Sequence, residues 1–138
     1  SPADQQTYLK VHNAERAKHG AKALTWNATL ATKAQQWANK CHFEHSGGSL
    51  ACISTENLAA GTGDYTITDA INGWDNEESQ YNPSSPQYSH WTQVVWKGTH
   101  QLGCAEATCN GIFDPKYGAA KYYVCEYYPA GNVIGEFA

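Results

Sequence analysis

The cysteine thiols give the first indication of chemistry in this sequence. Five of them occur in 138 residues, a density typical of disulfide-bonded proteins from oxidising compartments. They are Cys41, Cys52, Cys104, Cys109 and Cys125. No Cys-x-x-Cys pair is present, which disfavours a zinc ribbon or a thioredoxin-type redox site. Because the number of cysteines is odd, at least one thiol stays unpaired or pairs with another chain.

A glycosylation sequon gives a second sign of secretion. It begins at Asn27 and ends at Thr29, whereas the similar sequence at Asn82 is excluded by the proline that follows it. Asn27 also suits the N-cap of a helix, because its side chain can accept hydrogen bonds from the first free backbone N–H groups. Both interpretations of Asn27 stay open at this stage.

Charge and hydropathy exclude several classes of partner. The formal net charge is −4 and no run of Lys or Arg occurs, so we expect neither nucleic-acid binding nor a polybasic membrane surface. No apolar stretch approaches the ~20 residues of a membrane-spanning helix. The chain contains no Met, so we expect a mature or trimmed form, with which a removed leader is compatible.

Periodicity predicts three helices in the first part of the chain. The first runs to about residue 19, and Gly20 ends it as the residue after the cap. The second begins near Asn27, and its alanines and apolar residues recur at helical spacing. The third covers residues 68–81. We expect these helices to position any functional site that residues of the later strands and loops complete.

Strands are expected in the last part of the chain. They are predicted at residues 94–97, 101–108 and 121–128, the last of which is rich in Tyr and Val. Residues 42–63 lose all periodicity and are predicted to be loops and turns. Helices followed by strands, without repeats or a linker, predict one α+β domain over residues 1–138 with an antiparallel sheet.

Three segments together resemble one protein family. They are LKVHNAER at residues 9–16, SHWTQVVWKGT at residues 89–99 and YVCEYYPAGN at residues 123–132. The second and third resemble the two signatures of the CAP superfamily, which comprises cysteine-rich secretory, antigen-five and plant pathogenesis-related proteins. The absence of cysteines just before His90 makes the chain similar to the fungal and yeast members. Ser89 and Glu126 depart from the residues most common there.

The resemblance implies the fold and the disulfides. The family has a three-layer α-β-α sandwich with a central three-stranded antiparallel sheet. Its framework implies the bridges Cys41–Cys109 and Cys104–Cys125, which leaves Cys52. We expect Cys52 to be a buried free thiol, and the alternative is a contact with another chain.

The resemblance also implies a central cleft with two His and two Glu, which fall on His45, Glu56, Glu77 and His90. Two neutral imidazoles can bind one divalent metal, Zn²⁺ or Mg²⁺, while the carboxylates orient the rings or a bound water. The same four side chains can serve as the acid–base set of a metal-dependent hydrolase, or hold three loops together as a hydrogen-bond network without turnover. We favour a non-enzymatic role.

The other histidines are assigned no part in this cleft. His12 is predicted to be a structural hydrogen-bonding residue on the first helix. His19, His42 and His100 are predicted to lie at the surface or in loops.

An aromatic, proline-containing loop offers a lipid-binding surface. In yeast relatives the corresponding loop is implicated in sterol binding, and the residues that match here are Tyr81, Pro83, Pro86, Tyr88 and Trp91. Tyr and Trp present a flat apolar face with a polar edge, which suits a sterol and its hydroxyl. The alternative is that the tyrosines only cover the core. Some relatives hold fatty acids between helices, which here implies the first and third.

Three functions follow from these observations. The first is a secreted, extracellular protein that binds sterols or fatty-acid-like lipids, with a role in export, defence or host interaction. The second is the metal-dependent hydrolase, and the third is a non-enzymatic signalling or interaction module. We expect a monomer in each case.

Overall fold

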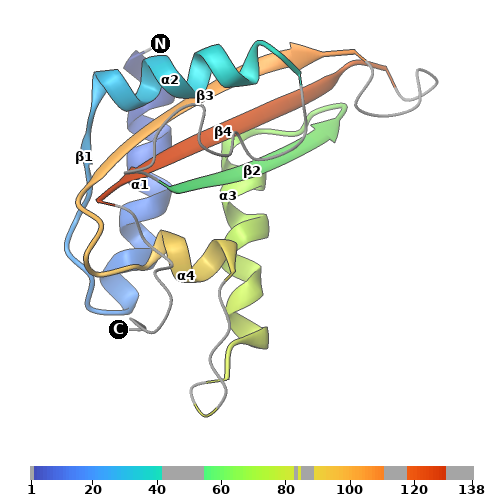
Figure 1. Ribbon diagram of the computed structural model, residues 1–138. Coiled ribbons are helices and arrows are strands. Elements are labelled where there is room, and N and C mark those ends of the chain that lie inside the picture. Colours follow the sequence, from blue (N-terminus) through green and yellow to red (C-terminus); the bar gives the residue numbers. More distant parts are fainter. Residues whose placement is uncertain (1, 42–54, 83, 85–88, 111–117, 130–138) are drawn as a thin grey trace.

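The computed structural model describes residues 2–41, 55–82, 84, 89–110 and 118–129 of the chain. Its elements, in chain order, are α1 (Pro2–Lys18), β1 (Thr25–Trp26), α2 (Ala28–Ala38), β2 (Thr55–Thr62), α3 (Ile67–Asp75), the 3-10 helix η1 (Asn76–Gln80), α4 (His90–Val94), β3 (Gln101–Cys109) and β4 (Ala120–Tyr128) (Figure 1). Among the described residues no helix is both long and apolar enough to cross a membrane.

One sheet joins all four described strands in the order β1-β3-β4-β2. β4 lies between β2 and β3 and is antiparallel to both, so the expected antiparallel core of three long strands is present. The sheet also has a short fourth strand, because β1 pairs in parallel with the start of β3, with Thr25 opposite Gln101 and Trp26 opposite Leu102.

Both faces of the sheet are buried by helices, as Figure 1 shows. On β4, Tyr122 and Val124 point to α2, whereas Tyr123, Cys125 and Tyr127 join the cluster formed with α1, α3 and α4. This alternation follows from the two-residue period of a strand. The predicted α-β-α sandwich is therefore confirmed, with α2 alone on one face and the site-bearing helices on the other.

Local sequence sets the ends of the first two helices as predicted. Gly20 has φ +72°, and the N–H groups of Gly20 and Ala21 donate to the carbonyls of Ala17 and Arg16, which is a Schellman motif. Asn27 caps α2, because its Oδ1 accepts hydrogen bonds from the N–H groups of Thr29 and Leu30.

The third predicted helix is present as two pieces. α3 covers Ile67–Asp75 and starts at a capping box, in which Thr66 and Asp69 bond to each other's backbone N–H. The remaining predicted turns form the tighter helix η1. Residues 76–80 thereby pack against α4, where the candidate site lies.

The predicted strand at residues 94–97 is wrong. Its first residue, Val94, ends α4, and the carbonyls of this segment bond to a side chain instead of a neighbouring strand. The buried guanidinium of Arg16 donates to the carbonyls of Val94 and Trp96 at 3.0 and 2.9 Å, and to that of Thr99 at 2.9 Å. Long-range hydrogen bonds from Arg16 of α1 therefore stabilise the conformation of this segment.

The prediction of loops throughout residues 42–63 is also wrong, because residues 55–62 form β2. Apart from the threonines at its two ends, the sequence TENLAAGT has none of the β-branched and aromatic residues that favour strands. It is extended because every one of its residues, from Thr55 to Thr62, lies opposite a residue of the Tyr- and Val-rich β4. Pairing with a strong strand compensates for its weak intrinsic preference.

Two disulfides link described residues. They are Cys41–Cys109, with Cα atoms 5.5 Å apart, and Cys104–Cys125, with Cα atoms 4.1 Å apart, which are the pairs that the resemblance implies. The first ties the end of α2 to the end of β3, and the second links the paired strands β3 and β4. Cys52 lies outside the described residues.

Candidate functional site

Glu77 and His90 meet where η1 packs against the start of α4. The Glu77 Oε1 atom accepts the backbone N–H of His90, and Oε2 contacts the ring Nδ1, each at 2.8 Å. The His90 ring stacks on Trp74 with 6.0 Å between ring centroids. Because a carboxylate accepts, Nδ1 carries the proton of the neutral ring, and Nε2 keeps the lone pair that a metal or a proton can take.

A buried hydrogen-bond chain supports His90 from behind. His12 Nδ1–H donates to the Tyr8 carbonyl at 2.8 Å, and His12 Nε2 accepts from the Tyr127 hydroxyl at 2.6 Å. The Asn57 amide donates to both the Tyr127 hydroxyl and the His90 carbonyl. His12 is fully buried, which confirms its predicted structural role. This series of hydrogen bonds connects α1, through β4 and β2, to the first residue of α4.

Burial determines the protonation states of His12 and Tyr127 in this series of hydrogen bonds. It lowers the pKa of His12 to about 4, and it raises the pKa of the Tyr127 hydroxyl well above its usual value. Both groups are therefore neutral near pH 7. A neutral imidazole that donates through one nitrogen and accepts through the other matches the two bonds of His12.

The four predicted cleft residues are placed unequally. Glu77 and His90 are in contact, and Glu56 is half-buried in β2, directly before the Asn57 that bonds to the His90 carbonyl. His45 lies outside the described residues. The convergence of all four side chains therefore stays a prediction.

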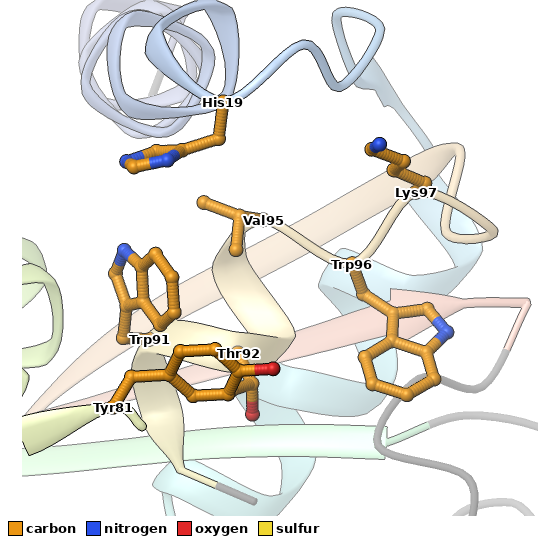
Figure 2. A pocket seen from close by; sticks show the side chains of 7 residues that line it. All are labelled: His19, Tyr81, Trp91, Thr92, Val95, Trp96 and Lys97. Atoms are coloured by element: carbon orange, nitrogen blue, oxygen red, sulfur yellow. The ribbon is translucent and has the colours of Figure 1, made fainter. Parts of the chain in front are cut away.

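A second feature is a hollow of about 170 Å³ between the end of α1, residue 81 and the α4 segment (Figure 2). It is called the aromatic hollow below, and it is lined by His19, Tyr81, Trp91, Thr92, Val95, Trp96 and Lys97. The Trp91 ring forms one wall, with Tyr81 5.2 Å away on one side and His19 5.2 Å away on the other, measured between ring centroids. Figure 2 shows Trp96 and Lys97 on the opposite side.

Two of the five predicted lipid-binding residues line this hollow. Tyr81 and Trp91 are in contact there, whereas Pro83, Pro86 and Tyr88 lie outside the described residues. Trp96 and Lys97 were not predicted as lining residues. The only signal for them was their place in the SHWTQVVWKGT segment. Because residues 94–97 were predicted to be a strand, the turn that brings these side chains to the hollow was missed.

The prediction that His19 is a surface or loop residue agrees with its position in a turn, but its side chain is partly buried. It is in the turn after α1, its side chain is only 29% exposed, and its ring packs edge-on against Trp91. Its neighbour one helical turn earlier, Glu15, is 7% exposed and accepts a 2.9 Å hydrogen bond from Trp91 Nε1. The four-residue spacing of Glu15 and His19 was the available signal.

A third feature is a polar hollow of about 300 Å³ between α1 and the α3–η1 segment, called the acidic hollow below. It is lined by Val11, Ala14, Glu15, Lys18, Asn72, Asp75, Asn76 and Glu78. Burial, together with the nearby Glu15 carboxylate, raises the pKa of Asp75 to about 7. Carboxylates and amides dominate this lining, so it suits cations and polar groups better than an apolar chain.

Comparison with known sequences gives one family and many relatives. The model of the cysteine-rich secretory protein family, CAP, matches residues 9–127. The fruiting body protein SC7 of Schizophyllum commune is 45% identical over an alignment of length 139, which covers 91% of this chain and 64% of SC7. The secreted protein RBT4 of Candida albicans is 42% identical over 94% of this chain and 36% of RBT4. The chain thus spans less than two thirds of either relative.

Solved structures share the fold. NaASP2, whose structure was determined with Zn²⁺, superposes with a TM-score of 0.81 over 99% of this chain and 85% of its own, at 21% sequence identity. At this level of identity the likeness establishes the sandwich architecture and the order of its elements.

Proposed function

The chain belongs to the CAP family of cysteine-rich secretory proteins, and from this premise we propose that it acts outside the cell as a binding domain for a flat apolar molecule such as a sterol. The aromatic hollow carries the proposal. Its wall of Trp91 and Tyr81 offers a stacking face, and Trp96 and Val95 add apolar surface. Ligand sites are usually lined in this way, with few polar groups among apolar ones.

The polar groups of the hollow suit a single hydroxyl. His19 and Lys97 are among its lining residues, and each carries a nitrogen able to hydrogen-bond a sterol hydroxyl. The volume, about 170 Å³, is below the roughly 300–1,000 Å³ of sites that enclose a whole ligand. The hollow therefore fits one end of a sterol, with the rest lying along the protein surface.

A fatty acid between α1 and α3 is less well supported. The described hollow between these helices is the acidic hollow, where Glu15, Asp75 and Glu78 would have to contact an apolar tail. Transfer of carboxylates into apolar surroundings is strongly unfavourable. The aromatic hollow is the better candidate among the described residues.

The Glu77–His90 pair also fits the divalent metal that the family implies. In metal sites an imidazole usually binds through one nitrogen while a carboxylate accepts the N–H of the other, and His90 has this arrangement with Glu77. His90 Nε2 would then be a ligand, and His45 and Glu56 would complete the set. A bound divalent ion would supply Lewis acidity. We do not propose hydrolysis, because both Glu77 oxygens already hold His90.

Secretion is part of the proposal. The two disulfides are stable in oxidising compartments, and the relative RBT4 is itself named a secreted protein. The single sequon falls on Asn27, whose side chain caps α2 and also donates to Gln101 at 2.9 Å. Glycosylation of Asn27 stays a prediction.

The test is a titration of the purified chain with radiolabelled cholesterol. We expect saturable binding that weakens at least tenfold in Tyr81→Ala, because the ring against Trp91 is lost. The matched control is Tyr128→Ala, which removes an exposed tyrosine that does not line the hollow and should bind as the unchanged chain does. Absence of saturable binding, or equal affinity of both variants, would contradict the proposal.

A further inference from the structure

Three ligand atoms converge where the end of α1 meets η1, on residues other than the Glu77–His90 pair. His19 Nε2 lies 3.3 Å from Glu15 Oε2 and 3.3 Å from Glu78 Oε2, and ligand atoms of the three residues all lie within 4.8 Å of one another. We propose that Glu15, His19 and Glu78 form a binding site for a divalent cation of the zinc class. The site is separate from the family's predicted cleft set.

The separations match the geometry of a tetrahedral metal. Zinc bonds to imidazole nitrogen and carboxylate oxygen are each about 2.0–2.2 Å, so neighbouring ligand atoms of a tetrahedral ion lie about 3.3–3.5 Å apart. Both separations from His19 Nε2 are 3.3 Å. That is longer than an ordinary hydrogen bond between nitrogen and oxygen, and it is suited to atoms that share an ion.

The His19 nitrogen lacks another explanation. Nε2 is buried and makes no hydrogen bond with any described residue, although two carboxylate oxygens face it. One ring nitrogen can direct its proton or lone pair at only one of them. If Nδ1 carries the proton, the lone pair of Nε2 faces two negative oxygens and is repelled by them. A cation between the three atoms would replace this repulsion with three favourable contacts.

The surroundings supply negative charge and further oxygen atoms. Glu15 and Glu78 border the acidic hollow together with Asp75, whose Oδ1 is buried without a hydrogen bond among the described residues. Lys18 is the nearby cation, 3.7 Å from Glu15 Oε1, and its side chain is 71% exposed. It can therefore move into solvent when an ion binds.

The donor set indicates which ion is preferred. One imidazole and two carboxylates suit Zn²⁺ with water as the fourth ligand, whereas Mg²⁺ and Ca²⁺ prefer oxygen atoms alone and higher coordination numbers. Glu15 is also oriented by Trp91, because Oε2, the oxygen that lies 3.3 Å from His19 Nε2, accepts the Trp91 Nε1–H. Such a partner orients a metal-bound carboxylate.

The test separates this site from the family cleft. In a His90→Gln background, which removes the cleft imidazole, calorimetric titration with Zn²⁺ should show one bound equivalent. Adding Glu78→Gln should weaken this binding at least tenfold. Glu78 is exposed, so its substitution leaves the fold intact. The matched control adds His100→Gln, which removes an exposed histidine elsewhere and should change nothing.

A second measurement uses the unchanged chain. Nitrogen-15 NMR of the histidine rings should show a large Zn²⁺-dependent shift of His19 Nε2 and a small one of Nδ1. If the His19 resonances do not respond to saturating Zn²⁺, the proposal is overturned. The proposal would also be overturned if the Zn²⁺ titration of the His90→Gln protein coincided with that of its Glu78→Gln derivative.

Discussion

Glu77 holds His90 by both its backbone and its ring, with one carboxylate oxygen for each and 2.8 Å in both contacts. The carboxylate therefore fixes the start of α4 and the orientation of the imidazole at once. The same α4 segment carries Trp91, the wall of the aromatic hollow. His90 and the Trp91 wall of the aromatic hollow are thus positioned by one short helix.

Glu77→Gln should release the His90 ring. The amide can accept only through its oxygen, so one of the two N–H groups of His90 loses its acceptor, and the charge that strengthens both bonds is gone. We expect the free energy of unfolding to fall by about 1–3 kcal/mol. Nitrogen-15 NMR should also show that the Nδ1–H tautomer of His90 is no longer dominant.

The control for this substitution is Asp64→Asn, which removes an exposed carboxylate outside the site and should alter neither quantity. If the His90 tautomer in Glu77→Gln equals that of the unchanged chain, Glu77 does not orient the ring.

His12 should make the fold sensitive to acid. Its pKa is about 4 in the folded protein and about 6.5 when unfolded, so the unfolded state binds more protons between these values. The stability associated with neutral His12 is complete above pH 6.5 and is lost as the pH falls toward 4. The loss reaches about 3 kcal/mol.

The measurement is urea unfolding between pH 4 and 7.5 for the chain and for His12→Gln. The glutamine does not titrate, so the difference in free energy between the two proteins should shrink steadily below pH 6.5. A difference that is constant with pH would show that another group causes the acid sensitivity.

Arg16→Lys should loosen the site-bearing segment after α4. The guanidinium donates to the carbonyls of Lys22, Val94, Trp96 and Thr99, and a lysine ammonium cannot reach this spread of acceptors. Burial lowers the pKa of Arg16 to about 10, which leaves it charged at pH 7. We expect a loss of about 2–4 kcal/mol in the free energy of unfolding.

Hydrogen exchange should locate this loss. The backbone amides of Trp96 and Thr99 should exchange faster in Arg16→Lys, whereas those in the β3–β4 ladder should change only through the global loss of stability. Lys10→Arg, at an exposed position of the same helix, serves as the control. Unchanged stability in Arg16→Lys would mean that the four carbonyls find other donors.

Local patterns were enough for α1, α2, β3 and β4. The ends of α1 and the start of α2 depend on Gly20 and Asn27, whose effects act over a few residues and are visible in the chain itself. The two strands are long and favourable in composition. The same local rules failed at residues 55–62, because the partner that makes them a strand is β4, more than 55 residues later.

The residues of the Glu77–His90 pair were also identified from the sequence. Three segments, one of them SHWTQVVWKGT, carried the family resemblance, and the resemblance implied Glu77 and His90. Their contact required η1 and α4 to pack together, which the structure shows. His45 and Cys52 stay predictions, because they lie outside the described residues.

The sequence by itself determined the types of side chain, the helical spacing of Glu15 and His19, and the family to which the cysteines and motifs belong. Only the tertiary structure decided that Glu78 and Trp91 lie beside them, 59 or more residues further along the chain. The reason is physical. Spacing along one helix follows from its own geometry, whereas contact between helices depends on how they bury their faces against a shared sheet.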